Sequence, residues 1–192
     1  MKAIVCEQFG EPTEVVIVRD INPPPHPKDN EVTVQVAYAT VSHAIDLLIR
    51  GKYQSDPPLP FTPGTEFVGT VLACGQQVQN LKVGDRVMGV ARWGCYAQQI
   101  NVSHHTVYPL LADLDWLQAL PLPLSYGTAY TSLFWKAELK PSHSVLVLGA
   151  GSGVGLAAVE LASTTGATVI ACASTKEKRA LAAAHGAKLV LE

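Results

Sequence analysis

The architecture of this chain follows from the segment Val145-Leu-Val-Leu-Gly-Ala-Gly-Ser-Gly-Val-Gly155. A short apolar run leads directly into a turn with four glycines, and the Ala- and Leu-rich residues 156–165 that follow are typical of a helix. A strand, a glycine turn and a helix in this order can hold the pyrophosphate of a dinucleotide on the amides of the helix N-terminus. The segment therefore predicts the start of a doubly wound domain with a nucleotide site.

The residues around this segment repeat the same alternation. A helix is predicted over 125–137, and strand, helix and strand follow over 168–173, 175–185 and 187–191. Strands that alternate with helices indicate a parallel sheet with right-handed crossovers. We therefore expect residues 122–192 to form the first half of a Rossmann domain.

The first part of the chain is β-rich instead. Alternating apolar and polar residues, separated by Gly, Pro, Asp and Asn, predict six strands over 3–6, 14–19, 31–38, 66–74, 86–90 and 95–102. One short helix is expected over 42–50, with Ser42 as its N-cap and Gly51 as its stop. Residues 1–121 are thus predicted to form a separate β-rich domain.

Composition narrows the class of protein. The 192 residues are 48% hydrophobic and 16% charged with a net charge of −2, which gives no electrostatic case for nucleic acid or an anionic membrane as partner. No apolar run approaches the ~18–20 residues that span a bilayer, and the N-terminus lacks the pattern of a signal peptide. The four cysteines are widely spaced, so we expect reduced thiols and a cytoplasmic location.

The glycine turn alone is a weak signal. A strict G-x-G-x-x-G ending at Gly155 would need glycine at positions 150 and 152, which hold Ala150 and Ser152. A tight structural turn without a ligand is the alternative. The flanking strand and helix favour a nucleotide, with Gly153 letting the backbone approach the phosphates and Ser152 offering a hydroxyl to a phosphate oxygen.

The end of the second strand bears on the choice of cofactor. Sites for NAD usually place Asp or Glu there, to bind the ribose hydroxyls. Here the strand end carries Ser174, Thr175, Lys176 and Lys178, which would attract a 2′-phosphate. This pattern favours NADPH over NADH, although two lysines at the start of a helix are also typical of an ordinary solvated face.

Several motifs occur in an order that resembles the medium-chain dehydrogenase/reductase superfamily, and within it the zinc-independent quinone oxidoreductase (zeta-crystallin-like) branch. The resemblance covers the whole chain. It implies a GroES-like, partly open β-barrel followed by a Rossmann domain, with hydride transfer in the cleft between them. Besides the glycine turn, the motifs are Asp46–Tyr53, Pro57–Gly69, Leu81–Val87, Gly94–Ala97 and Leu120–Tyr130.

The zinc ligands of the superfamily's alcohol dehydrogenases are not matched. Their Gly-His-Glu is Gly64-Thr65-Glu66 here, and Thr65 cannot replace an imidazole as a zinc ligand. The two cysteine positions fall at His43 and near Leu120. We therefore expect no metal, and a zinc alcohol dehydrogenase that binds its metal through His43 is a less favoured alternative.

The resemblance also implies site residues. His43 stands where the branch commonly carries Asn near the nicotinamide, and Tyr53 matches a tyrosine of the same cleft. A neutral imidazole could donate to a substrate carbonyl or supply a proton, or His43 could simply cap or pack at the helix start. Tyr53 could bind a quinone oxygen or only wall the pocket. The implied cofactor contacts are Thr128 on the nicotinamide side, Ser152, Gly153 and Val154 at the pyrophosphate, and Ser174, Thr175 and Lys178 at the 2′-phosphate.

These observations predict an NADPH-dependent oxidoreductase that transfers hydride to a quinone or an α,β-unsaturated carbonyl. Members of the family continue well past position 192 and are commonly homo-oligomers, so we expect a truncated chain. A non-catalytic nucleotide-binding module or fragment is the alternative.

Overall fold

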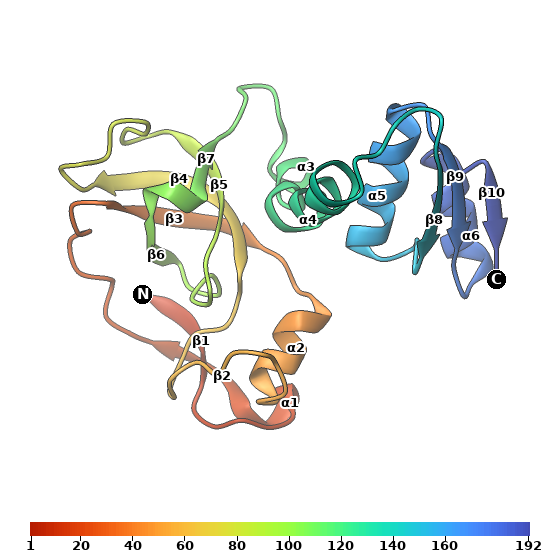
Figure 1. The fold of residues 1–192 in the computed structure, drawn as a ribbon. Coiled ribbons are helices and arrows are strands. Elements are labelled where there is room, and N and C mark those ends of the chain that lie inside the picture. Colours follow the sequence, from red (N-terminus) through yellow and green to blue (C-terminus); the bar gives the residue numbers. More distant parts are fainter. The chain divides into compact units, whose positions relative to one another are not determined.

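A computed structural model describes all of residues 1–192, and the chain divides into two compact units, Met1–Leu120 and Pro121–Glu192 (Figure 1). Both predicted architectures are confirmed: an antiparallel, partly open barrel and the first half of a doubly wound sheet. No helix is long and apolar enough to cross a bilayer.

The first unit is built on a five-stranded antiparallel sheet with the order β6-β3-β4-β5-β7. Alternate side chains on its strands turn inward, so that Val32, Val34, Phe67, Val87 and their neighbours form one apolar core. The strands are β3 (Glu31–Ala39), β4 (Glu66–Cys74), β5 (Arg86–Val90), β6 (Gln99–Ser103) and β7 (Val107–Pro109).

A hairpin of β1 (Lys2–Cys6) and β2 (Val16–Asp20) continues this unit. The amide of Ile4 donates to the Tyr96 carbonyl at 2.8 Å, and the amide of Cys6 donates to the Phe61 carbonyl at 2.8 Å. Strand β1 is therefore attached to the loops that precede β4 and β6, which closes the barrel on one side only.

Two predicted strands began too early. The strand expected over 14–19 starts at Val16, because Pro12–Val15 form one helical turn, α1, with proline at its start. The strand expected over 95–102 is regular only over Gln99–Ser103. The amides of Cys95 and Tyr96 instead bond to the carbonyls of Gly64 and Pro63. Tertiary pairing with another loop thus overrides the local alternation.

Helix α2 (His43–Ile49) confirms the predicted short helix of this unit. It buries Ile45, Leu48 and Ile49 in a second apolar cluster with Cys6 and Phe61. Ser42 is the N-cap residue, as predicted, although its hydroxyl makes no capping hydrogen bond. The short helix α3 (Trp116–Ala119), which was not predicted from the sequence, ends the unit.

The second unit contains three parallel strands in the order β10-β9-β8, which is the strand order of the first half of a Rossmann sheet. The strands are β8 (Ser144–Leu148), β9 (Thr168–Cys172) and β10 (Leu189–Leu191), and the crossovers are α5 (Gly153–Thr164) and α6 (Lys176–Ala184). A continuous helical segment over 122–136, with α4 (Gly127–Tyr130) at its centre, precedes β8 and packs on α5. Small and β-branched side chains fill the space between sheet and helices.

Candidate functional site

The predicted nucleotide turn joins the end of β8 to the start of α5. Gly149 has φ +70°, a left-handed conformation that glycine adopts without strain. Gly153 and Val154, the first two residues of α5, are exposed. The first amides of a helix have no acceptor within the helix, so they are available to an anion. The turn therefore has the form that a pyrophosphate requires.

The hydroxyl of Ser152 is used inside the turn. It donates to the Gly149 carbonyl at 2.8 Å and accepts from the Gly155 amide at 3.2 Å, which makes Ser152 the N-cap of α5. The sequence had suggested a phosphate oxygen as the partner of this hydroxyl. Since its hydrogen already has an acceptor, a phosphate contact from the hydroxyl would require it to leave Gly149.

Two glycines of the turn allow close approach of other groups. A Cβ on Gly155 would lie 2.3 Å from the Gly149 carbonyl oxygen, so only glycine lets α5 start this close to β8. A Cβ on Gly151 would lie 2.6 Å from the Cβ of Lys178. The stem of Lys178, from helix α6, therefore lies against the glycine turn, and the fold brings this predicted 2′-phosphate ligand next to the predicted pyrophosphate site.

The other predicted 2′-phosphate ligands lie where β9 passes into α6. Ser174 is exposed and makes no hydrogen bond in the structure. Thr175 is the N-cap of α6, and its hydroxyl accepts from the Lys178 amide at 3.3 Å. The neighbouring Glu177 carboxylate has its pKa lowered by its own backbone amide and by the Thr175 hydroxyl, so it is charged. Of the three predicted ligands, Ser174 and Lys178 are the ones free to bind an anion.

Two further charged side chains at this position were not predicted from the sequence. Glu177 places a negative charge one residue before Lys178 and opposes the binding of a 2′-phosphate. Arg179 donates to the Ala173 carbonyl at 2.8 Å, which holds a guanidinium at the end of β9. No sequence signal identifies Arg179, because its contact with Ala173 depends on how α6 turns away from β9.

The predicted nicotinamide contact Thr128 lies in α4 with an exposed side chain. Three residues before it, Ser125 approaches the start of α5, since its Oγ lies 2.9 Å from the position of a Cβ on Gly153. No sequence signal identifies Ser125, because its contact depends on how two helices pack. The second unit thus brings Ser125 together with the glycine turn.

A carboxylate on α5 bridges two other helical segments of the second unit. Glu160 accepts a short hydrogen bond from the Tyr126 hydroxyl and lies 2.7 Å from Nδ1 of His185. The Tyr126 hydrogen bond, with a further contribution from His185, lowers the pKa of Glu160 despite partial burial. The same hydrogen bond, followed by burial and the negative charge, raises the pKa of Tyr126 to about 12. This group ties the helices behind the turn together.

The predicted residues of the acceptor side lie in the first unit. His43 is the first residue of α2, its side chain is 83% exposed, and its Nδ1 lies 4.0 Å from Oδ2 of Asp46. Tyr53 follows α2 and is half-buried against the apolar cluster of that helix. Both ring systems therefore belong to the same end of the unit.

The position of the missing zinc ligand is a packed turn. Gly64 has φ +93°, and a Cβ there would lie 2.5 Å from the Tyr96 ring. Cys95 is buried, and burial, with the charge of Glu66, raises the pKa of its thiol to about 12. A protonated, buried thiol is a poor metal ligand. No three His, Cys, Asp or Glu side chains come close enough together to hold a metal ion.

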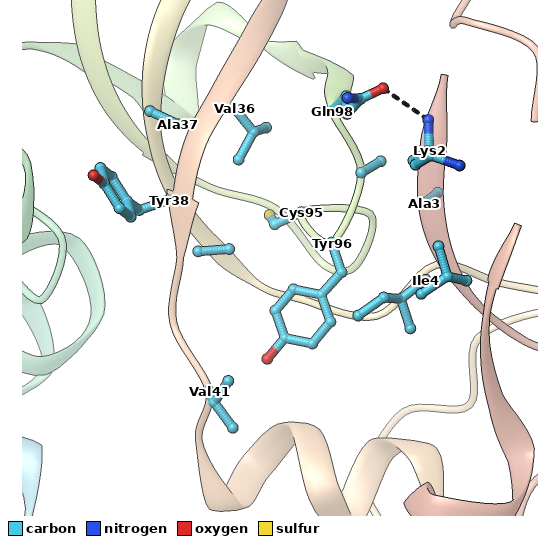
Figure 2. A pocket seen from close by; sticks show the side chains of 13 residues that line it. Lys2, Ala3, Ile4, Val36, Ala37, Tyr38, Val41, Cys95, Tyr96 and Gln98 are labelled. Carbon is cyan, nitrogen blue, oxygen red and sulfur yellow. Dashed lines mark hydrogen bonds between the residues drawn. The ribbon is translucent and has the colours of Figure 1, made fainter. Parts of the chain in front are cut away.

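An apolar depression of the first unit lies beside Cys95 and Tyr96. It has a volume of about 430 Å³ and is lined by side chains of β1, β3 and the loop 95–98 (Figure 2). The Tyr96 ring forms one wall, and its hydroxyl donates to the Thr40 carbonyl at 2.6 Å. None of the predicted site residues lines this depression.

Known proteins resemble this chain along its length. The model of the alcohol dehydrogenase GroES-like domain matches residues 28–112. Quinone oxidoreductase-like protein 2 of Rattus norvegicus is 38% identical over 190 residues, which are 97% of this chain and 53% of that protein. Quinone oxidoreductase of Homo sapiens is 36% identical over 188 residues, which are 97% of this chain and 57% of that protein.

The fold is found again among solved structures. The quinone oxidoreductase of Thermus thermophilus, solved also in complex with NADPH, has a TM-score of 0.86 and 32% identity, over 99% of this chain and 59% of that chain. This chain therefore spans little more than half the length of the relatives that it matches.

Proposed function

Because the chain belongs to the medium-chain dehydrogenase/reductase superfamily and is similar to its quinone oxidoreductases, we propose that it carries the cofactor cradle and the proton donor of an NADPH-dependent oxidoreductase. The proposed substrates are quinones or α,β-unsaturated carbonyls. The observation that carries the proposal is the turn between β8 and α5, with Gly155 packed on Gly149 and the stem of Lys178 lying against Gly151.

The residues of the second unit would bind the cofactor. NADPH supplies a hydride when bound. The amides of Gly153 and Val154 would face the pyrophosphate, with Ser152 shaping the turn as its N-cap. Ser174 and Lys178, with Thr175 holding the start of α6, would face the 2′-phosphate. Thr128 would approach the nicotinamide side. Lys178 would attract the 2′-phosphate and Glu177 would repel it, so the ratio of NADPH to NADH affinity measures which of the two charges dominates.

The residues of the first unit would act on the acceptor. Reduction of a carbonyl or quinone needs one polar group on the acceptor oxygen, and beyond that mainly orientation. His43 is exposed, and its imidazole would deliver the proton to the acceptor oxygen. The phenol of Tyr53 would hydrogen-bond the same class of oxygen.

Calorimetric titration of the intact chain with NADPH and with NADH tests the cradle. We expect saturable binding of one nucleotide per chain, with NADPH bound at least about tenfold more tightly, which is about 1.4 kcal/mol. Absence of binding by either nucleotide would show that the turn is structural. Tighter binding of NADH would overturn the assignment of the 2′-phosphate ligands.

Oxidation of NADPH by a panel of quinones and enones tests the reaction. Turnover that depends on both NADPH and the acceptor supports the proposal. Confirmed nucleotide binding with no turnover on a broad panel would favour the second candidate, a non-catalytic nucleotide-binding module. The specific observation behind that candidate is that the chain spans 53–57% of its curated relatives.

The proposal extends to the metal content, the location and the oligomeric state of the protein. We propose that the reaction needs no metal, and stoichiometric zinc found by elemental analysis would revive an alcohol dehydrogenase that uses His43 as a ligand. The family resemblance implies a cytoplasmic protein and a homo-oligomer in full-length relatives, with a small molecule and not a nucleic acid or membrane as partner. Sedimentation of the chain would measure its oligomeric state directly.

A further inference from the structure

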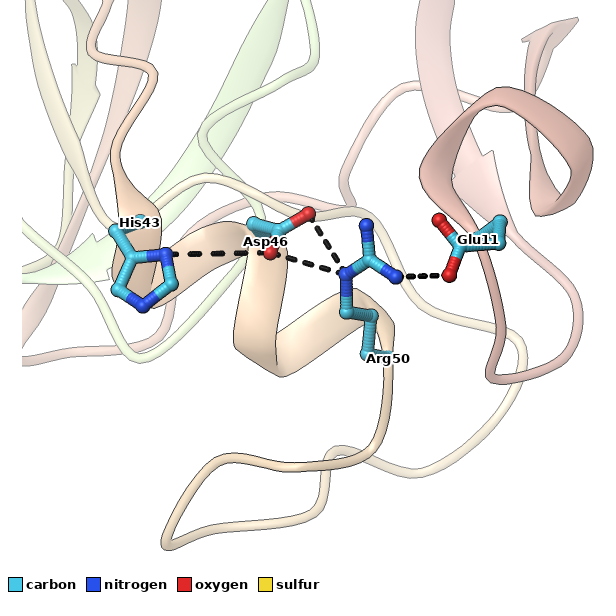
Figure 3. Close-up of polar contacts among 4 residues, drawn as sticks. All are labelled: Glu11, His43, Asp46 and Arg50. Carbon is cyan, nitrogen blue, oxygen red and sulfur yellow. Dashed lines mark hydrogen bonds and ion pairs between the residues drawn. The ribbon is translucent and has the colours of Figure 1, made fainter.

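A network of polar side chains runs along α2, from His43 at its first residue to Arg50 at its C-cap, and includes Asp46 and Glu11 (Figure 3). Nε of Arg50 donates to both carboxylate oxygens of Asp46 at 3.0 Å, and a second guanidinium nitrogen donates to Glu11. On its other side, Oδ2 of Asp46 lies 4.0 Å from Nδ1 of His43. The Asp46 carboxylate therefore stands between the guanidinium and the imidazole, as Figure 3 shows.

The charges of this network do not balance without His43. Glu11 and Asp46 contribute two negative charges and Arg50 one positive charge, which leaves one negative charge. Glu11 first, and Asp46 second, raise the pKa of Arg50, so the guanidinium stays charged throughout the working range. Glu14 on α1, and Lys52, Tyr53 and Asp56 in the loop after α2, form no ion pair with the network. The Asp46 carboxylate that faces His43 is therefore not fully neutralised within the network.

The Asp46 carboxylate offsets an unfavourable effect of the helix on a positive charge at His43. His43 is the first residue of α2, and the positive end of a helix disfavours a cation there. Asp46 lies in the same first turn and offsets that effect with a full negative charge at short range. At 4.0 Å the contact is an ion pair and not a hydrogen bond, so it acts through charge.

The two ring nitrogens of His43 are not equivalent in this arrangement. Nδ1 faces Asp46, whereas the second nitrogen, Nε2, does not (Figure 3). A carboxylate beside one nitrogen favours the hydrogen on that nitrogen when the ring is neutral. Nε2 then carries a hydrogen only when the ring is protonated. The hydrogen on Nε2 is therefore the one that the ring gives up as a proton.

We propose that Asp46 is a positioning residue for His43, which keeps a hydrogen on Nδ1 in both charge states and makes Nε2–H the proton donor to the acceptor oxygen. This role rests on the proposed function. The acceptor gains a hydride and a proton and loses one π bond, and the proton that its oxygen takes is the one on Nε2. Neutral His43 remains, and water returns the proton to Nε2.

Nitrogen NMR of the imidazoles in the intact, isotope-labelled chain tests the pairing without any turnover. Asp46→Asn removes the adjacent negative charge, so the titration midpoint of His43 should fall by about half a pH unit. Arg50→Gln leaves two uncompensated carboxylates, so the midpoint should rise by a similar amount. Glu14→Gln, on an exposed and unconnected residue of α1, is the matched control and should not move it.

The hydrogen position on the neutral ring is a second readout. The nitrogen shifts of neutral His43 should report hydrogen mainly on Nδ1, and Asp46→Asn should move the hydrogen toward Nε2. Shifts of the same sign in Asp46→Asn and Arg50→Gln, or shifts no larger than those of Glu14→Gln, would overturn the proposal. Circular dichroism in the amide region checks that each variant is folded. Local unfolding would change the His43 NMR signal and the circular dichroism spectrum together, so an unchanged spectrum excludes it as the cause of an NMR shift.

Turnover distinguishes the failure of this role from the failure of the proposed function. With turnover, Asp46→Asn should lower kcat at neutral pH with little change in KM and should shift the pH profile to lower pH. An unchanged profile overturns the positioning role while the oxidoreductase assignment stands. Opposite NMR shifts in a chain that binds nucleotide but never turns over support the pairing and overturn the proposed reaction.

Discussion

Helices α2 and α5 both begin after a serine, and the two serines behave differently. Ser152 hydrogen-bonds both to the Gly149 carbonyl and to the Gly155 amide, so it fastens α5 to the end of β8. Ser42 makes no capping hydrogen bond, and the first turn of α2 is held by the ion pair of Asp46 with Arg50. Serine at the N-cap therefore has a different role in each helix. In α5 its hydroxyl stabilises the glycine turn, whereas in α2 ion pairs between other side chains stabilise the helix.

The two helix starts differ in the sequence separation between the residues that hydrogen-bond there. Both hydrogen bonds of the Ser152 hydroxyl are to residues three positions away, Gly149 and Gly155. The network at α2 includes Glu11, which is 39 residues from Arg50 in sequence. A site made of local backbone is fixed wherever its glycines occur, whereas a side-chain site exists only after the chain has folded back on itself.

The largest expected effect tests the cradle itself. Gly155→Ala would push a Cβ against the Gly149 carbonyl, and since both sides are backbone, we expect a loss of about 2–3 kcal/mol in the free energy of unfolding of the second unit. Gly127→Ala is the matched control, because its nearest neighbour would be the Leu122 carbonyl at 3.8 Å. Urea unfolding followed by circular dichroism compares the two. Equal stability would mean that α5 does not need its close approach to β8.

The second effect concerns Lys178, a side chain that helix α6 brings to the cradle. Lys178→Ala removes the ammonium next to Gly151, and we expect the affinity for NADPH to fall about tenfold, or about 1.4 kcal/mol, with NADH affinity unchanged. Calorimetric titration with both nucleotides measures this. Lys188→Ala, at an exposed lysine just before β10 and outside the predicted 2′-phosphate ligands, should leave both affinities as they are. Parallel losses for both nucleotides would assign Lys178 to the pyrophosphate instead.

The third effect compares the two serines directly. Ser152→Ala removes a cap with two hydrogen bonds and should lower the free energy of unfolding by about 1 kcal/mol. Ser42→Ala removes a hydroxyl without a capping bond and should change the stability of the first unit by less than about 0.3 kcal/mol. Thermal or urea unfolding of the two variants decides the matter. If Ser42→Ala proves as damaging as Ser152→Ala, the two helix starts are alike in solution.

The smallest effect depends on pH and concerns the carboxylate of α5. The hydrogen bond that Glu160 accepts from Tyr126, with a further contribution from His185, holds the pKa of Glu160 below the ordinary 4.5. The resulting stabilisation of the folded state is therefore fully present above pH 4.5. It is lost as the pH falls through the lower pKa of the folded state. Glu160→Gln should therefore lower the free energy of unfolding by about 0.5–1 kcal/mol at neutral pH. The difference from the parent chain should vanish in acid. Glu14→Gln should show no such pH dependence, and a difference that grows in acid would contradict the lowered pKa.

Local patterns predicted most of the secondary structure. The strands over 66–74 and 86–90 were predicted residue for residue. Strand β5 alternates buried and half-buried residues, as its sequence pattern does, whereas the first four residues of β4 are all buried. The errors lie where partners are distant. Residues 95–98 have a strand pattern but bond to the loop 62–64 and to β1, and α1 interrupts a pattern that otherwise is typical of a strand.

The candidate site divides in the same way. The glycines that form the nucleotide turn were visible in the sequence, since positive φ and close approach restrict their positions to glycine. The approach of Ser125 to α5, the position of Lys178 against Gly151 and the bridge through Glu160 were not visible. Each of these depends on which faces two helices turn toward each other, and that choice follows from packing across the sheet.

By itself, the sequence determined that this chain has a β-rich unit, half of a Rossmann unit and a glycine turn between a strand and a helix. Those features depend on periodicity and on backbone conformation, which neighbouring residues control. The tertiary structure alone decided that the Ser152 hydroxyl points into its own turn, that the stem of Lys178 lies against the turn, and that Asp46 stands between Arg50 and His43. These arrangements depend on charges and packed surfaces from distant parts of the chain, which become neighbours only on folding.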